Sequence, residues 1–160
     1  MGNKYTLTVV LLLLVLPVAS IFIEYFADPR PHDVMWLIGM WFTFWGCGVR
    51  LFTAGMMQVS KPQFTAGSIF NLHDPAAHGL VREIGFGNLS LGTLGLVSLI
   101  AHSWVVPAAV AGGMYYGLAG LGHLMRSERN AKEQVALVSD LLIAAVLAAF
   151  ALYQLFRIFA

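Results

Sequence analysis

Five polar residues fall inside stretches of the sequence that are otherwise apolar. They are Arg50, Glu83, Asn88, His123 and Asp140. An ionisable side chain within hydrocarbon costs about 2.5 to 3.5 kcal/mol on insertion scales, so it normally faces a partner or a cavity. An arginine, two carboxylates, a histidine and an amide can bind a small solute or ion, and a histidine beside a carboxylate can transfer a proton.

The composition of the chain indicates which elements carry these residues. Of the 160 residues, 59% are hydrophobic and 11% are charged, whereas a soluble domain carries about 25% charged residues. The formal net charge of +1 leaves no basic surface for nucleic acid, and the single cysteine, Cys47, excludes a disulfide framework. The sequence therefore predicts an all-α, polytopic membrane protein.

Five apolar stretches are each long enough to cross a bilayer, which takes about 20 residues. They predict a single integral membrane domain, a bundle of five transmembrane helices over residues 5–26, 34–58, 80–101, 104–125 and 135–156. Asp74 and Pro75 mark a helix start before the third stretch, because a carboxylate can cap a helix whose first residue is proline. Residues 59–73 are expected to form a loop or a short interfacial segment.

The distribution of lysine and arginine predicts the orientation of the bundle. With the N-terminus in the cytoplasm, six basic residues lie at the inner ends and loops, namely Lys4, Lys61, Arg82, Arg126, Arg129 and Lys132. The outer side keeps Arg30 and Arg157. Cytoplasmic loops carry the excess of basic residues, so we expect an inner (plasma) membrane protein with its N-terminus in the cytoplasm and its C-terminus outside. All five polar residues then lie in the cytoplasmic half.

Small and polar residues recur at helical spacing in four of the predicted spans. The stripes are Gly39, Thr43, Gly46, Arg50 and Thr53; Gly85, Asn88, Gly92 and Gly95; Gly112, Tyr116, Ala119 and His123; and Ala136, Asp140, Ala144, Ala148 and Ala151. Small residues let helices approach closely in a membrane. Each stripe is therefore predicted to face protein, and each brings one or more polar residues with it.

One segment of the chain also resembles a known family. From Glu83 the sequence reads EIGFGNLSLGTLGLVS, later GLGHLM, then a basic turn and a span with an early aspartate, Asp140. This order of Glu, Asn, glycines, Gly-His and Asp resembles a functionally uncharacterised family of small bacterial integral membrane proteins. The resemblance points to Glu83, Asn88, His123 and Asp140 as site residues and implies no particular activity.

Three kinds of function fit the polar cluster. Our first prediction is that it binds or conducts a small solute, ion or proton, and conduction would suit a homo-oligomer because five short helices hardly enclose a pore. The alternative is a membrane-embedded enzyme, or a protein that binds a lipid, quinone or isoprenoid, and it requires an apolar pocket continuous with the cluster. In the third, a structural or accessory subunit, the charges only neutralise one another. The expected partner is the lipid bilayer, with no metal, cofactor or nucleic acid.

Overall fold

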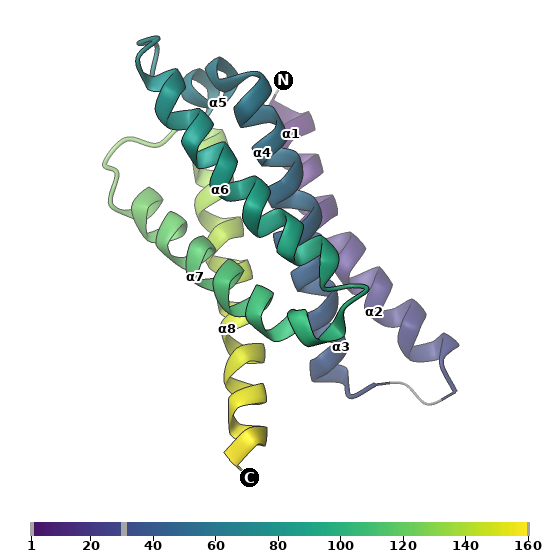
Figure 1. Cartoon of the computed structure of the whole chain (residues 1–160). Helices are drawn as coiled ribbons and strands as arrows, with labels where there is room; N and C mark the ends of the chain where they lie inside the picture. Colours follow the sequence, from purple (N-terminus) through teal and green to yellow (C-terminus); the bar gives the residue numbers. More distant parts are fainter. Residues whose placement is uncertain (1, 30–31, 160) are drawn as a thin grey trace.

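The computed structural model describes residues 2–29 and 32–159, and every regular element in that part of the chain is helical (Figure 1). Two of the long rods are each built from three consecutive segments with a π-helical middle. They are α1 (Gly2–Val10), η1 (Leu11–Val15) and α2 (Leu16–Ala27), then α3 (Val34–Phe42), η2 (Thr43–Leu51) and α4 (Phe52–Ser60). The remaining rods are α6 (Ala77–Val97), α7 (Val105–Leu124) and α8 (Ala131–Phe159), with the short α5 (Pro62–Ser68) and η3 (His102–Trp104) between rods. The two ends of the chain lie at opposite ends of the bundle (Figure 1).

Four helical stretches within the described residues are long and apolar enough to span a membrane. They are Lys4–Ala27, Val34–Ser60, His102–Leu124 and Ala131–Phe159. The fifth predicted span is not confirmed: α6 has 21 residues but carries Arg82 and Glu83 near its start. It also ends at Val97, four residues before the predicted boundary, and a turn connects it to η3. The structure therefore supports a helical, multi-pass membrane protein with four clear spans.

The helix α6 packs closely against η2 and α4 although it is the least apolar rod (Figure 1). A Cβ atom added at Gly92 would lie 2.5 Å from the backbone nitrogen of Phe52, and one added at Gly55 would lie 2.8 Å from the carbonyl oxygen of Gly85. No side chain fits at either position. The predicted stripe of α6 is confirmed as the packing face, since Gly85, Asn88, Gly92 and Gly95 are all buried.

The buried face of α8 differs from the predicted stripe. Ala136 and Asp140 are buried as expected, but the face continues through Ile143, Leu147 and Phe150, and Ala148 is exposed. A strict four-residue spacing rotates by about 40° at each step in a helix of 3.6 residues per turn. The predicted row of alanines therefore moves to the edge of the buried face. Ala144 still faces α7, since a Cβ added at Gly117 would lie 3.7 Å from its Cβ, but Ala148 is exposed and there the prediction is wrong.

The start of α3 is tied to the last turns of α8. The carboxylate of Asp33 accepts a hydrogen bond from the backbone N–H of Met35 at 2.9 Å, which caps α3. It also accepts one from the hydroxyl of Tyr153 at 2.6 Å and lies 3.3 Å from a guanidinium nitrogen of Arg157. These contacts, the Tyr153 hydrogen bond above all, hold the pKa of Asp33 below its usual range. Arg30, assigned to the same side of the bundle from the sequence, lies outside the described residues.

Candidate functional site

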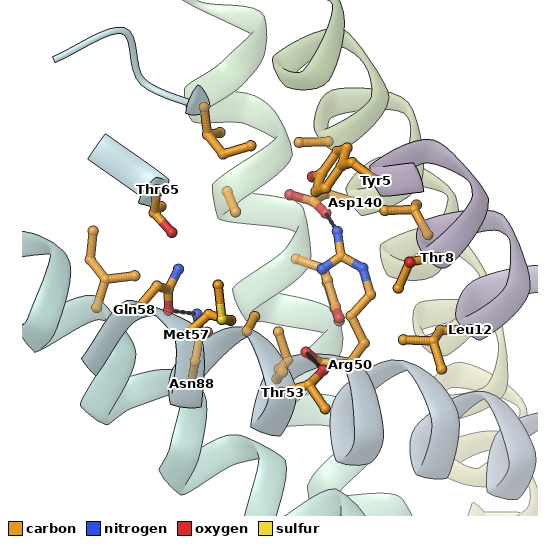
Figure 2. A pocket seen from close by; sticks show the side chains of 18 of the residues that line it. Tyr5, Thr8, Leu12, Arg50, Thr53, Met57, Gln58, Thr65, Asn88 and Asp140 are labelled. Carbon is orange, nitrogen blue, oxygen red and sulfur yellow. Dashed lines mark hydrogen bonds and ion pairs between the residues drawn. The ribbon is translucent and has the colours of Figure 1, made fainter. Parts of the chain in front are cut away.

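A cavity of about 330 Å³ lies inside the bundle, toward the end that carries α5 (Figure 2). Side chains from α1, η1, η2, α4, α5, α6, α7 and α8 line it, and most of the lining surface is apolar. Four of the five residues selected from the sequence line this one cavity, namely Arg50, Asn88, His123 and Asp140. The volume lies within the range of small-molecule binding sites, about 300 to 1,000 Å³.

Arg50 forms an ion pair with Asp140 across the cavity wall. One terminal guanidinium nitrogen of Arg50 lies 3.8 Å from Oδ1 of Asp140, and Tyr5 of α1 lies beside the pair (Figure 2). Asp140, and not Glu83, is therefore the carboxylate paired with Arg50. Arg50 belongs to the π-helical segment η2, a kind of distortion that is frequent at functional sites. Its Nε atom is buried and has no hydrogen-bond partner among the described residues.

His123 lies between two carboxylates. Its Nδ1 atom is 3.0 Å from Oε1 of Glu133, and its Nε2 atom is 4.0 Å from Oδ2 of Asp140. The ring of Phe70 stacks on the imidazole with the centroids 6.0 Å apart and the planes 15° apart. The imidazole is therefore held in one orientation, with each ring nitrogen directed toward a different acid.

Glu133 is the member of this group that the sequence analysis missed. It is 1% exposed, and its Oε1 atom also accepts the guanidinium of Arg126 at 3.1 Å. The sequence analysis assigned it to a turn, whereas α8 begins at Ala131. Two signals could have found it. Asn130 caps the helix, accepting the backbone N–H of Glu133 at 3.0 Å, and acidic residues favour the first turn after such a cap. Glu133 also precedes Asp140 by seven residues, which is about two helical turns.

Glu83 does not join the group. Its side chain is exposed, it does not line the cavity, and it has no hydrogen bond or ion pair within the described residues. Glu83 and Asn88 are five residues apart, which places them about 140° apart around α6. Because Asn88 lies on the face that packs against α4, Glu83 is turned away from the cavity. Glu133 takes the place of the second carboxylate.

Asn88 forms the second polar group in the cavity (Figure 2). Its side-chain nitrogen donates to Oε1 of Gln58 at 2.7 Å, and the residue is only 3% exposed. Its oxygen, Oδ1, is buried and has no hydrogen-bond partner among the described residues. The wall of the cavity thus holds one buried, unpaired donor, on Arg50, and one buried, unpaired acceptor, on Asn88, among the described residues. Over the same residues, no group of three or more histidine, cysteine or acidic side chains is arranged to hold a metal ion.

The apolar helices and the buried polar groups fit a multi-pass membrane protein with an internal cavity. The chain belongs to DUF6790, a family of unknown function, whose model matches residues 5–157 and so nearly the whole bundle. No curated protein and no solved structure matches the chain. An uncharacterised family is what the sequence resemblance implied, and membership brings no activity or site residue with it.

Proposed function

We propose that this protein binds a small lipophilic molecule in the cavity beside Arg50 and Asn88. The observation that carries the proposal is the pair of buried, unpaired polar atoms, Nε of Arg50 and Oδ1 of Asn88, in a cavity with mainly apolar walls. An unsatisfied buried polar group costs about 1 to 3 kcal/mol. A ligand with an apolar body and a polar head would pair these atoms once the Arg50 or Asn88 side chain turns toward the cavity, and would bury its body against the walls.

This proposal takes up the alternative that required an apolar pocket continuous with the polar cluster. Conduction of a solute, ion or proton is less favoured, because a hydrophilic permeant needs polar groups along its path and the walls offer few. The role of a purely structural subunit is also less favoured. Protein interiors are normally close-packed, and charges that only neutralise one another do not explain why a cavity of about 330 Å³ lies beside them.

Replacing Asn88 with leucine is expected to reduce ligand occupancy about tenfold, the equivalent of one lost hydrogen bond. Native mass spectrometry of the protein released from micelles that contain decanol would measure this occupancy. The matched control is Ser90→Leu, since Ser90 lies on the same helix, is exposed, and bonds only to the carbonyl of Phe86. Equal occupancy in wild type and Asn88→Leu would contradict the proposal.

We further propose that α6 crosses the membrane as a fifth span, which gives a cytoplasmic N-terminus and an external C-terminus in the inner membrane. The two termini lie at opposite ends of the bundle, which supports an odd number of membrane crossings (Figure 1). The six basic residues near α5 and the α7–α8 turn support a cytoplasmic location for that end.

Cysteine labelling from each side of sealed vesicles tests this topology. Ser127→Cys, in the α7–α8 turn, is expected to react only from the cytoplasmic side, and Ile158→Cys only from outside; both positions are exposed. The native Cys47 is buried and does not compete for the reagent. Reaction of both variants from the same side would contradict five spans.

A further inference from the structure

The cavity opens on the side of the bundle. Five of its lining residues are exposed: Thr8 of α1, Thr53 and Met57 of α4, Phe64 of α5, and Ile84 of α6. Met57 is 40% exposed and Phe64 is 41% exposed. The helix α1 packs on α8 and scarcely contacts α4. Figure 2 shows Arg50 between Thr8 on one helix and Thr53 on the other. Thr8, Thr53, Met57 and Phe64 therefore mark an opening between α1 and α4, with α5 beside it, whereas Ile84 lies on α6.

The rim of this opening is apolar. The hydroxyl of Thr8 donates to the carbonyl of Lys4 at 3.0 Å, and the hydroxyl of Thr53 donates to the carbonyl of Val49 at 2.8 Å. Both hydroxyls are thus satisfied within their own helices. The rim presents methyl groups, a thioether and the ring of Phe64, and the ammonium of Lys132 lies 5.3 Å from the centroid of that ring. Leu7 on the outer surface of α1 is 66% exposed, and both helices belong to stretches apolar enough to span a membrane. Lipid chains are the surroundings that match such a rim.

The end of the bundle above the cavity is covered. Arg126 donates to the carbonyl of Phe70 at 2.9 Å, and Asn130 donates to the carbonyl of Ile69 at 3.1 Å. These bonds hold the chain after α5 against the α7–α8 turn, and Phe70 and Ile69 line the cavity from that side. A molecule from the aqueous phase at this end would have to displace them, whereas one from the bilayer meets the open rim.

The charges around the cavity select an uncharged ligand. In the salt-bridged group around His123, the positive charges of Arg50 and Arg126 balance the negative charges of Asp140 and Glu133. Lys132 lies outside this group, over the ring of Phe64. A charged ligand head would add an uncompensated charge to a buried site, which is strongly unfavourable. A hydroxyl group is neutral and both accepts and donates. It can therefore accept from Nε of Arg50 or donate to Oδ1 of Asn88.

We infer that the cavity takes an uncharged lipid-soluble alcohol that enters sideways from the bilayer between α1 and α4. This inference rests on the proposed function, and it adds the charge of the ligand and its route. Decanol and decanoate are suitable probes because their chains match and only the alcohol is uncharged at neutral pH. Native mass spectrometry should show decanol bound at least about tenfold more than decanoate at equal mole fraction in the micelle. Equal or stronger binding of decanoate would overturn the selection for an uncharged head.

Bulky side chains at the rim test the route. Thr8→Trp and Thr53→Trp are expected to slow the uptake of decanol by about tenfold, because a tryptophan would narrow the opening. Thr93→Trp is the matched control: Thr93 is also exposed, bonds to its own helix at the carbonyl of Leu89, and lies away from the cavity. Unchanged uptake in both rim variants would overturn the sideways route.

A spin label at Thr53→Cys gives an independent measurement of what the rim faces. Oxygen concentrates in lipid, so it should increase the relaxation rate of the spin label more than a water-soluble nickel complex does. The reverse order would overturn the lipid-facing route even if decanol binds. If decanol does not bind to the wild type at all, the proposed function fails. If decanol binds but the rim variants take it up at the wild-type rate, or the label is relaxed more by the nickel complex, only the sideways route from the bilayer fails.

Discussion

Replacing Arg50 with leucine is expected to lower the free energy of unfolding by about 3 to 5 kcal/mol, because it leaves a buried carboxylate without its cation. The carboxylate concerned is Asp140, 3.8 Å from the guanidinium and 6% exposed. His123 lies 4.0 Å away on the other side of Asp140 and is already engaged with Glu133 at 3.0 Å. Reversible unfolding in mixed micelles with increasing denaturing detergent measures the change.

A second substitution identifies the partner of Arg50. The double variant Arg50→Leu with Asp140→Leu should recover much of the loss, since no unpaired charge remains from the pair. Arg50→Leu with Glu83→Leu is the control and should recover nothing, because Glu83 is exposed and outside the cavity. Rescue by the Glu83 substitution alone would show that the ion pair has been assigned to the wrong carboxylate.

Substitution of Gly95 by alanine is the second change with a large expected effect. An added Cβ would overlap the backbone nitrogen of Gly48 and lie 2.7 Å from its Cα atom and 2.8 Å from the carbonyl carbon of Cys47. Backbone atoms cannot rotate away, so α6 must move from η2. We expect a loss of about 3 kcal/mol, the upper part of the usual range for overpacking.

Gly87 provides the matched control for this prediction. It lies on the same helix, and an added Cβ would meet nothing within 4 Å. Gly87→Ala should be neutral or stabilise the protein by up to about 1 kcal/mol, because alanine favours helix more than glycine does. The same detergent titration compares the two variants. Equal effects of the two substitutions would mean that the close contact of α6 with η2 is wrong.

The sequence predicted the buried faces of α6 and α7 and the start of α6, but not the whole face of α8. The glycine stripe of α6 and the stripe of α7 through Tyr116 and His123 are buried as predicted, because small and polar residues cluster where helices meet. The helix start near Asp74 is also close to its predicted place: its carboxylate accepts the N–H of Ala76 at 2.9 Å, and α6 begins at Ala77.

Sequence patterns could not predict the π-helical segments or the pairing of His123 with Glu133, for physical reasons. The π-helical segments change the number of residues per turn locally, so a fixed helical period cannot place residues through them. One of them, η1, ends at Val15, two residues before Pro17, whose ring and missing N–H disturb the hydrogen bonds of the turn before it. The pairing of His123 with Glu133 depends on the turn between α7 and α8, and no periodicity describes a turn.

Filling the cavity beside Arg50 and Asn88 with a larger side chain tests whether this cavity is a ligand site. Ala119 lines the cavity, and Ala119→Phe would occupy the space with an apolar ring. We expect this variant to fold with undiminished stability and to show no bound decanol by native mass spectrometry. The control Leu118→Phe, at an exposed position outside the cavity, should bind decanol as the wild type does. A folded Ala119→Phe variant that binds decanol as well as the wild type would contradict the account.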